Sequence, residues 1–113
     1  MELRTLKHAP EVMTVVLDGR MDAAGAGSVD RQLNEIAGSY HGLIVDMSAV
    51  YFLASAGIRT LLSAAKTLQR QGGTLVLLAP RPDIAAVLEV TGILDLLPVA
   101  LTQEEAARKV GLR

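Results

Sequence analysis

The chain is predicted to fold as an α/β domain built on a mostly parallel sheet of four or five strands. Short runs rich in Val, Ile and Leu alternate with longer segments whose apolar residues recur at helical spacing. This alternation is typical of parallel strands covered by helices and predicts the order β-β-α-β-α-β-α-β-α. With 113 residues, half of them apolar and a fifth charged, the chain is expected to form a single domain over residues 1–113.

The first two strands are predicted to pair as an antiparallel hairpin. Residues 3–8 alternate weakly, and residues 12–17 form a β-branched run. Ala9-Pro10-Glu11 between them is a turn sequence. Residues 18–22 are then expected to be a loop at the end of the second strand.

A first helix is predicted over residues 23–37. Asp22 precedes it as the N-cap, and Gly38 is expected to end it. Gly25 and Gly27 weaken the first turns by about 1 kcal/mol each relative to alanine. The apolar stripe of this helix consists of Val29, Leu33 and Ile36.

The central strand is predicted to begin at Gly42 and to end at Asp46, because residues 43–45 are a short apolar run. Such a strand fits the middle of a sheet that is covered on both faces. Residues 48–54 are then expected to be an unusually apolar loop. Asp46 and Ser48 are expected to order this loop by bonding backbone N–H groups.

Ser55 is predicted to be the N-cap of a second helix, with Ala56 and Gly57 as its first helical positions. The glycines at positions 72 and 73 are expected to end the helix in a left-handed cap. Its apolar face consists of Ile58, Leu61, Leu62, Ala65 and Leu68. The opposite face carries Arg59, Ser63, Lys66 and Arg70. That face either is simply solvated or meets an acidic partner.

The last third of the chain is predicted to hold two strands and two helices. Residues 74–79 form an apolar strand, and Pro82 takes an early position in a helix that runs to about residue 91. The residues of this helix expected to face inward are Ile84, Val87 and Leu88. Residues 93–97 are expected to be a turn with two buried leucines.

The final elements are a short edge strand and a helix. Residues 98–101 contain a proline, which an edge strand tolerates. Thr102 is followed three residues later by Glu105, which matches a capping box at the start of the last helix.

Composition and motifs argue against several classes of protein. A net charge of −1 disfavours a nucleic-acid binder, and the absence of cysteine excludes disulfides and thiolate metal sites. No apolar run approaches the roughly 20 residues that span a bilayer, and no signal pattern opens the chain. A cytoplasmic protein without membrane insertion is therefore expected. No common hydrolase, nucleotide or zinc motif is present. Two isolated histidines, His8 and His41, make a poor metal site, so neither an enzyme nor a cofactor is expected.

Ser55 is the residue with the most specific chemistry. Serine at the start of a helix lies beside backbone N–H groups that lack intrahelical partners, in the positive end of the helix dipole. A phosphate there would be tolerated and would add about −1.5 to −2 charges to the surrounding surface. The alternative is that Ser55 only caps the helix.

Loops that follow parallel strands meet at one edge of a sheet, which is where α/β proteins bind partners. Asp22, Asp46, Ser48 and Ser55 could therefore lie close together. Tyr51 or Leu53 is expected to be an exposed contact residue, whereas Phe52 is expected in the core. The surface expected to contact a partner consists of Asp22, Tyr51, Leu53, Ala54, Ala56, Gly57 and Arg59.

Residues 46–59, D-M-S-A-V-Y-F-L-A-S-A-G-I-R, resemble the signature of the STAS domain, in particular of bacterial anti-sigma-factor antagonists. Three further segments resemble family motifs in the same order: residues 17–22 (LDGRMD), 72–77 (GGTLVL) and 87–93 (VLEVTGI). The family pattern carries a serine that a partner kinase phosphorylates, and Ser55 occupies that position. Many members have an acidic residue where this chain has Ala54 and a second serine where it has Ala56.

The resemblance implies a binding switch rather than a catalyst. Its implied partner is an anti-sigma factor that is also a serine kinase, with a histidine-kinase-like ATPase fold. The unmodified protein would bind this partner and release the sigma factor, phosphorylation of Ser55 would end the binding, and a phosphatase would reset it. Two alternatives stay open: an unphosphorylated STAS adaptor on another ATPase, such as a lipid-transport ABC complex, and a STAS domain that binds a nucleotide or another small ligand.

Overall fold

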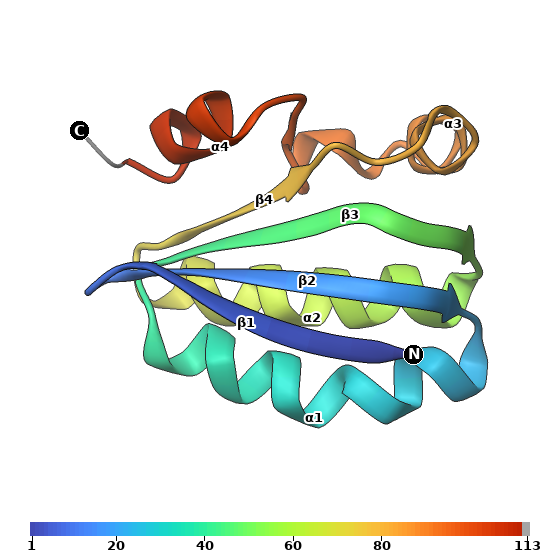
Figure 1. Ribbon diagram of the computed structural model, residues 1–113, viewed down its shortest axis with the longest axis horizontal. Coiled ribbons are helices and arrows are strands. Elements are labelled where there is room, and N and C mark those ends of the chain that lie inside the picture. Colours follow the sequence, from blue (N-terminus) through green and yellow to red (C-terminus); the bar gives the residue numbers. More distant parts are fainter. Residues whose placement is uncertain (112–113) are drawn as a thin grey trace.

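The structure, a computed structural model, describes residues 1–111 except for the side chains of residues 7 and 8. In this part of the chain the strands form one five-stranded sheet in the order β1-β2-β3-β4-β5 (Figure 1). The first two strands pair antiparallel and all later pairs are parallel. The strands are β1 (Glu2–Ala9), β2 (Val12–Met21), β3 (Gly42–Leu53), β4 (Thr74–Leu78) and β5 (Val99–Ala100). The predicted α/β class, hairpin and element order are confirmed.

Helices cover both faces of the sheet. In Figure 1, α1 and α2 lie side by side beneath it, and α4 lies on the opposite side. The helices are α1 (Ala23–Ser39), α2 (Ser55–Arg70), α3 (Pro82–Val90) and α4 (Gln103–Lys109), with a short 3₁₀ turn η1 (Ile93–Asp95).

The core is divided by the sheet into two apolar clusters. The larger one joins alternate strand residues such as Leu43 and Val45 to Leu33 of α1 and Leu61 of α2. The smaller one lies under α4 and takes in Ile44 of the same strand. Because Leu43, Ile44 and Val45 are fully buried, the first part of β3 is covered on both faces, as predicted.

The central strand does not end at Asp46, and the predicted loop over residues 48–54 is wrong. β3 continues to Leu53, and β2 continues to Met21 beside it. Pairing with β4 stops at Asp46, so the ends of β2 and β3 extend beyond β4 as a two-stranded ribbon. We call residues 18–21 and 49–53 the β2–β3 tip. The predicted loop over residues 18–22 is likewise mostly strand.

The expected end of α1 differs from the structure, whereas that of α2 does not. α1 continues through Gly38 to Ser39, because Gly38 takes no left-handed conformation that would end it and the Ser39 hydroxyl bonds the Glu35 carbonyl. α2 ends as predicted: Gly72 has φ +76°, and the Gly73 N–H bonds the Leu68 carbonyl at 2.8 Å.

The C-terminal third buries fewer apolar side chains than expected. Ile84 and Leu88 are buried, but Val87 is 37% exposed because this nine-residue helix has only one side against the core. Between residues 93 and 97 only one leucine, Leu97, is buried. The cap of α4 forms as predicted: the Thr102 hydroxyl accepts a hydrogen bond from the Glu105 N–H at 3.2 Å.

Candidate functional site at the start of α2

Ser55 is the first residue of α2 and is exposed to solvent. It is not the N-cap, as the sequence suggested. Ala54 holds that position in extended conformation, and its carbonyl accepts the N–H groups of Gly57 at 3.0 Å and Ile58 at 3.2 Å. Within the described residues the Ser55 hydroxyl has no hydrogen-bond partner. The hydroxyl is therefore available to a visiting molecule.

Two residues expected on the contact surface instead hold α2 in place. Gly57 is buried, and a Cβ there would lie 2.7 Å from Met21 Cγ, 2.8 Å from Leu53 Cδ1 and 2.9 Å from the Met21 carbonyl oxygen. Leu53 is only 7% exposed and belongs to the core. The Ala54 N–H also bonds the Met21 carbonyl at 3.0 Å. The first turn of α2 is thus packed directly against the β2–β3 tip.

The two aromatic side chains of the tip are both exposed. Tyr51 is 50% exposed, as expected, but Phe52 is 39% exposed and is not a core residue. Strand register places Arg20 beside Phe52, and the guanidinium lies 4.3 Å from the centre of the phenyl ring. This cation–π pair was not anticipated from the sequence, because it depends on which residues of β2 and β3 face each other.

Asp22 lies immediately beyond the tip and caps α1. Its carboxylate accepts the Gly25 N–H at 2.8 Å and lies 3.5 Å from the Arg20 guanidinium. The backbone hydrogen bond, with a smaller contribution from Arg20, lowers the pKa of Asp22 below its ordinary value of 3.8. Asp22 and Tyr51 line a shallow depression of about 320 Å³ beside the start of α1. The structure therefore brings these two predicted contact residues together.

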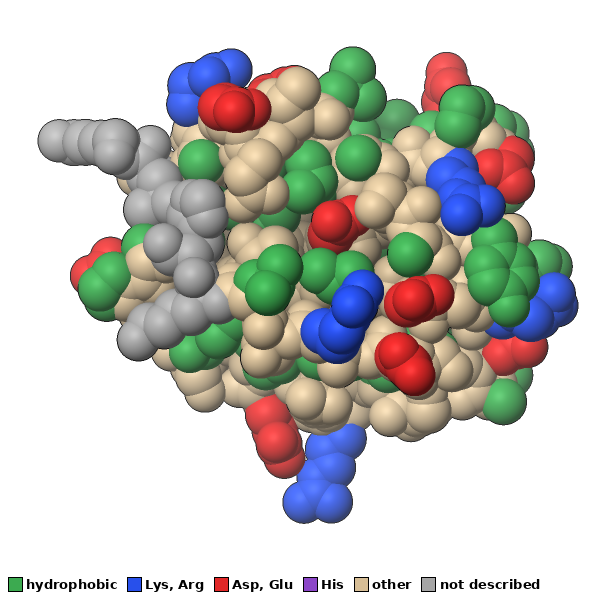
Figure 2. Space-filling view, in the orientation of Figure 1, with side chains coloured by type: hydrophobic (Ala, Val, Ile, Leu, Met, Phe, Trp, Pro, Cys, Tyr) green, Lys and Arg blue, Asp and Glu red, His purple; other side chains and the backbone are tan. Residues whose placement is uncertain are grey.

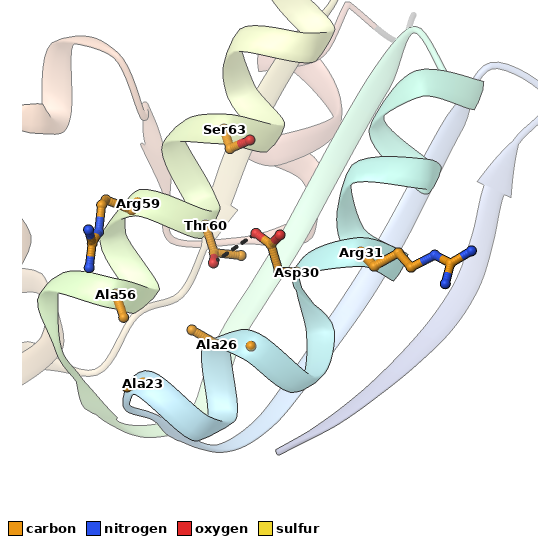
Figure 3. A pocket seen from close by; sticks show the side chains of 9 residues that line it. Ala23, Ala26, Asp30, Arg31, Ala56, Arg59, Thr60 and Ser63 are labelled. Carbon is orange, nitrogen blue, oxygen red and sulfur yellow. Dashed lines mark hydrogen bonds between the residues drawn. The ribbon is translucent and has the colours of Figure 1, made fainter.

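A second depression, of about 470 Å³, runs between α1 and α2 (Figure 3). Its lower part in the figure carries small side chains such as Ala23 and Ala56. Asp30 and Thr60 point toward each other across it and share a hydrogen bond of 3.0 Å. Arg59 lies at the edge and points outward. We call this depression the α1–α2 groove; it joins the predicted contact residues Ala56 and Arg59 to α1.

Asp46 and Ser48 lie apart from the residues around Ser55. They occupy the middle of β3, where the Asp46 carboxylate accepts the Ser48 N–H at 2.9 Å and its hydroxyl at 2.7 Å. Arg81 bonds the Ser48 carbonyl at 3.0 Å. Leu53 lies five positions after Ser48 on the strand, a distance of about 17 Å. Asp46 and Ser48 therefore order the backbone as expected, but within a strand and not in a loop. The expected cluster of these two residues with Asp22 and Ser55 does not form.

These features define a class of protein: a small α/β domain that presents an exposed serine on the first turn of a helix, beside exposed aromatic residues. The chain belongs to the STAS domain family, whose model matches residues 4–106. Within the described residues no group of His, Cys, Asp and Glu could hold a metal ion, and no helix has the length and apolarity needed to cross a bilayer.

Several proteins of similar sequence or fold are named as anti-sigma factor antagonists. BtrV of Bordetella bronchiseptica, named as an anti-sigma factor antagonist, is 29% identical over 104 residues, covering 91% of this chain and 90% of that protein. An anti-sigma factor antagonist from Mycobacterium paratuberculosis has a TM-score of 0.82 and 25% identity, covering 96% of this chain and 94% of that chain. The unphosphorylated form of the anti-sigma factor antagonist SpoIIAA has a TM-score of 0.82 with 18% identity and covers 99% of both chains. The phosphorylated form of SpoIIAA from Bacillus has a TM-score of 0.73 with 22% identity, covering 96% of this chain and 99% of that chain.

Proposed function

We propose that this protein is an anti-sigma factor antagonist that is switched off by phosphorylation of Ser55. The observation that carries the proposal is the exposed, unbonded hydroxyl on the first turn of α2. Membership of the STAS family and similarity to proteins named as anti-sigma factor antagonists support it. The proposed partner is an anti-sigma factor that is also a serine kinase of the histidine-kinase-like ATPase fold.

The unmodified protein binds this partner through the surface around Ser55 and thereby frees the sigma factor. Tyr51 and Phe52 supply exposed aromatic area beside the serine, and such residues often dominate binding energy. Asp22 and Arg59 supply polar groups at the two depressions.

In the switching step, the Ser55 hydroxyl oxygen attacks the γ-phosphorus of ATP bound to the kinase. The bond to the β-phosphate oxygen breaks, ADP leaves, and the hydroxyl proton passes to a base on the kinase. The new phosphate adds about −1.5 to −2 charges at the centre of the interface. Leaving such a charge unpaired and buried costs several kcal/mol. About 5.5 kcal/mol moves a population from almost fully bound to almost fully free, so one phosphate has the required size of effect. A phosphatase hydrolyses the ester and restores the binding form.

The proposal is tested by incubating the protein with ATP and each purified histidine-kinase-like ATPase encoded by the source genome. Intact mass and peptide mapping are expected to show one phosphate, on Ser55. Ser63→Ala, which removes another exposed serine of the same helix, should be labelled like the natural protein, whereas Ser55→Ala should not be labelled. Labelling of Ser55→Ala at the natural rate would reject the site.

Binding is measured with the same ATPases by calorimetry. The unmodified protein is expected to bind, and Ser55→Asp is expected to bind more weakly because it places one negative charge at the same point. Equal affinity of the two forms would contradict the electrostatic mechanism.

An unphosphorylated adaptor that docks on another ATPase is the second candidate, and Ala54 favours it. A small apolar residue precedes Ser55, and the first turn of α2 carries no acidic side chain that could guide a kinase. Intact-mass measurement of protein isolated from its native cells separates the two functions. Complete absence of the phosphate under all growth conditions would favour the adaptor.

A further inference from the structure

The charged residues on the exposed side of α2 are all cationic. Arg59, Lys66 and Arg70 are all exposed, and their spacing of seven and four residues places them along one stripe of the helix together with Ser63. The helix contains no Asp or Glu. This charge lies on a protein whose net charge is −1, so it is a local feature and not a reflection of the overall composition. We call these three residues the α2 stripe.

The stripe differs from the charged surfaces of α1 and α4, each of which contains an ion pair. α1 pairs Arg31 with Glu35 at 3.2 Å, and α4 pairs Lys109 with Glu105 at 3.5 Å, each across one helical turn. The face in Figure 2 also places acidic and basic side chains near one another. Within residues 1–111, by contrast, no member of the α2 stripe takes part in an ion pair. The positive charge of the stripe is therefore available to pair with acidic groups of another molecule.

The stripe begins beside the proposed site. Arg59 lies one turn after Ser55 and borders the α1–α2 groove. With a rise of 1.5 Å per residue, Arg70 lies about 22 Å from Ser55 along the helix axis. A standard protein interface of about 800 Å² per partner is wide enough to include both ends.

We propose that the α2 stripe docks against an acidic surface of the same ATPase that acts on Ser55, so that the interface extends along the helix to Arg70. The inference rests on the proposed function and adds the chemistry of the partner's surface. Charge complementarity of this kind mainly accelerates association, which then falls as salt increases. Aromatic contacts near Ser55 supply the short-range part of the binding, while the stripe attracts and orients the partner.

The test compares two double variants with the same change in net charge. Lys66→Glu with Arg70→Glu reverses the distal part of the stripe and leaves the residues next to Ser55 untouched. Arg4→Glu with Arg108→Glu reverses two exposed charges on β1 and α4 and serves as the control. Circular dichroism and urea unfolding establish that both variants are folded.

Association with the panel of histidine-kinase-like ATPases is measured at about 50 mM and about 200 mM salt. The stripe variant is expected to associate roughly tenfold more slowly than the natural protein at low salt and to lose most of the salt dependence. The control variant is expected to stay within about twofold. Should both variants slow association equally, only net charge matters and the inference is overturned.

The other outcomes separate this inference from the proposed function. An ATPase that labels Ser55 and binds both double variants normally overturns the docking surface alone. Slower association of the stripe variant with an ATPase that never labels Ser55 supports an acidic docking surface but overturns the switch, and with it the claim that the docked ATPase acts on Ser55. If no ATPase of the panel binds the natural protein, both are overturned.

Discussion

Gly57 determines how closely α2 approaches the end of β2. A methyl group at this position would meet the Met21 carbonyl at 2.9 Å and two buried side chains at shorter range. Because the backbone carbonyl cannot rotate away, we expect Gly57→Ala to lower the free energy of unfolding by about 1–3 kcal/mol. The measurement is urea unfolding followed by circular dichroism.

Gly27→Ala is the matched control for this prediction. Gly27 is also helical, but a Cβ there has open space around it. Alanine is therefore expected to raise stability, by up to about 1 kcal/mol. If Gly57→Ala were as stable as Gly27→Ala, the close contact between α2 and the strand end would be refuted.

At the scale of single residues, the sequence predicts the exposure of some contact residues correctly and that of others wrongly. Ser55 and Tyr51 are exposed as expected, yet the assignments of Leu53 and Phe52 are reversed. Both are large apolar residues in one apolar run, so hydropathy does not distinguish them. Which one faces the core depends on the register with β2, which shifts just before Arg20. A shift of one residue exchanges the two faces of a strand.

The N-terminus of α1 depends on one carboxylate. Since the bond from the Gly25 N–H lowers the pKa of Asp22, the unfolded chain binds a proton at this group more readily than the folded chain. The contribution of Asp22 to stability is therefore fully present above its ordinary value of 3.8 and is lost as the pH falls below it.

We accordingly expect the midpoint of urea unfolding to fall less steeply between about pH 5 and about pH 2 in Asp22→Asn than in the natural protein. Asparagine retains a capping oxygen but does not titrate in this range. Identical pH profiles for the two proteins would show that this cap does not contribute to acid sensitivity.

At the scale of elements, the predictions fail where a strand is supported by distant sequence. Polar Asp46 and Ser48 suggested the end of β3, but the two side chains bond each other and the strand continues. Its second half is held by residues 18–21 of β2, some thirty positions earlier in the chain. The hydropathy pattern of neighbouring residues does not predict pairing with such a distant segment. Two of the three predicted helix N-caps, Asp22 and Thr102, were correct, because they depend on neighbouring residues. The third was wrong by one residue, since Ala54 and not Ser55 caps α2.

For the whole molecule, the proposed switch requires that modification change the surface and not the fold. The first turn of α2 offers N–H groups and a positive dipole, so a negative group at Ser55 is compatible with the folded state. We expect Ser55→Asp to unfold with unchanged stability or a gain of up to about 1 kcal/mol. The measurement is thermal and urea unfolding of the isolated protein.

Ser63→Asp adds the same charge two turns into α2, where the dipole offers little, and is expected to gain nothing. A loss of more than about 1 kcal/mol in Ser55→Asp alone would mean that the charge acts by loosening the domain. The proposed mechanism, in which only the interface is affected, would then be untenable.

The fold as a whole was the most predictable level, because alternating strand and helix patterns extend over the entire chain. The arrangement of the site was less predictable. The site forms where β2 and β3 extend beyond β4 and where α2 begins against their ends. No local sequence pattern predicts this arrangement.

The close packing of α2 against the β2–β3 tip affects the entropy of partner binding. The backbone around Ser55 is fixed by the buried Gly57 and by the bond from the Ala54 N–H to Met21, so it has little freedom to lose when a partner binds. Preorganised contacts of this kind reduce the entropic penalty of association. Because the backbone that carries Ser55 is fixed, a newly acquired charge stays at this point of the surface, where it acts on the bound partner.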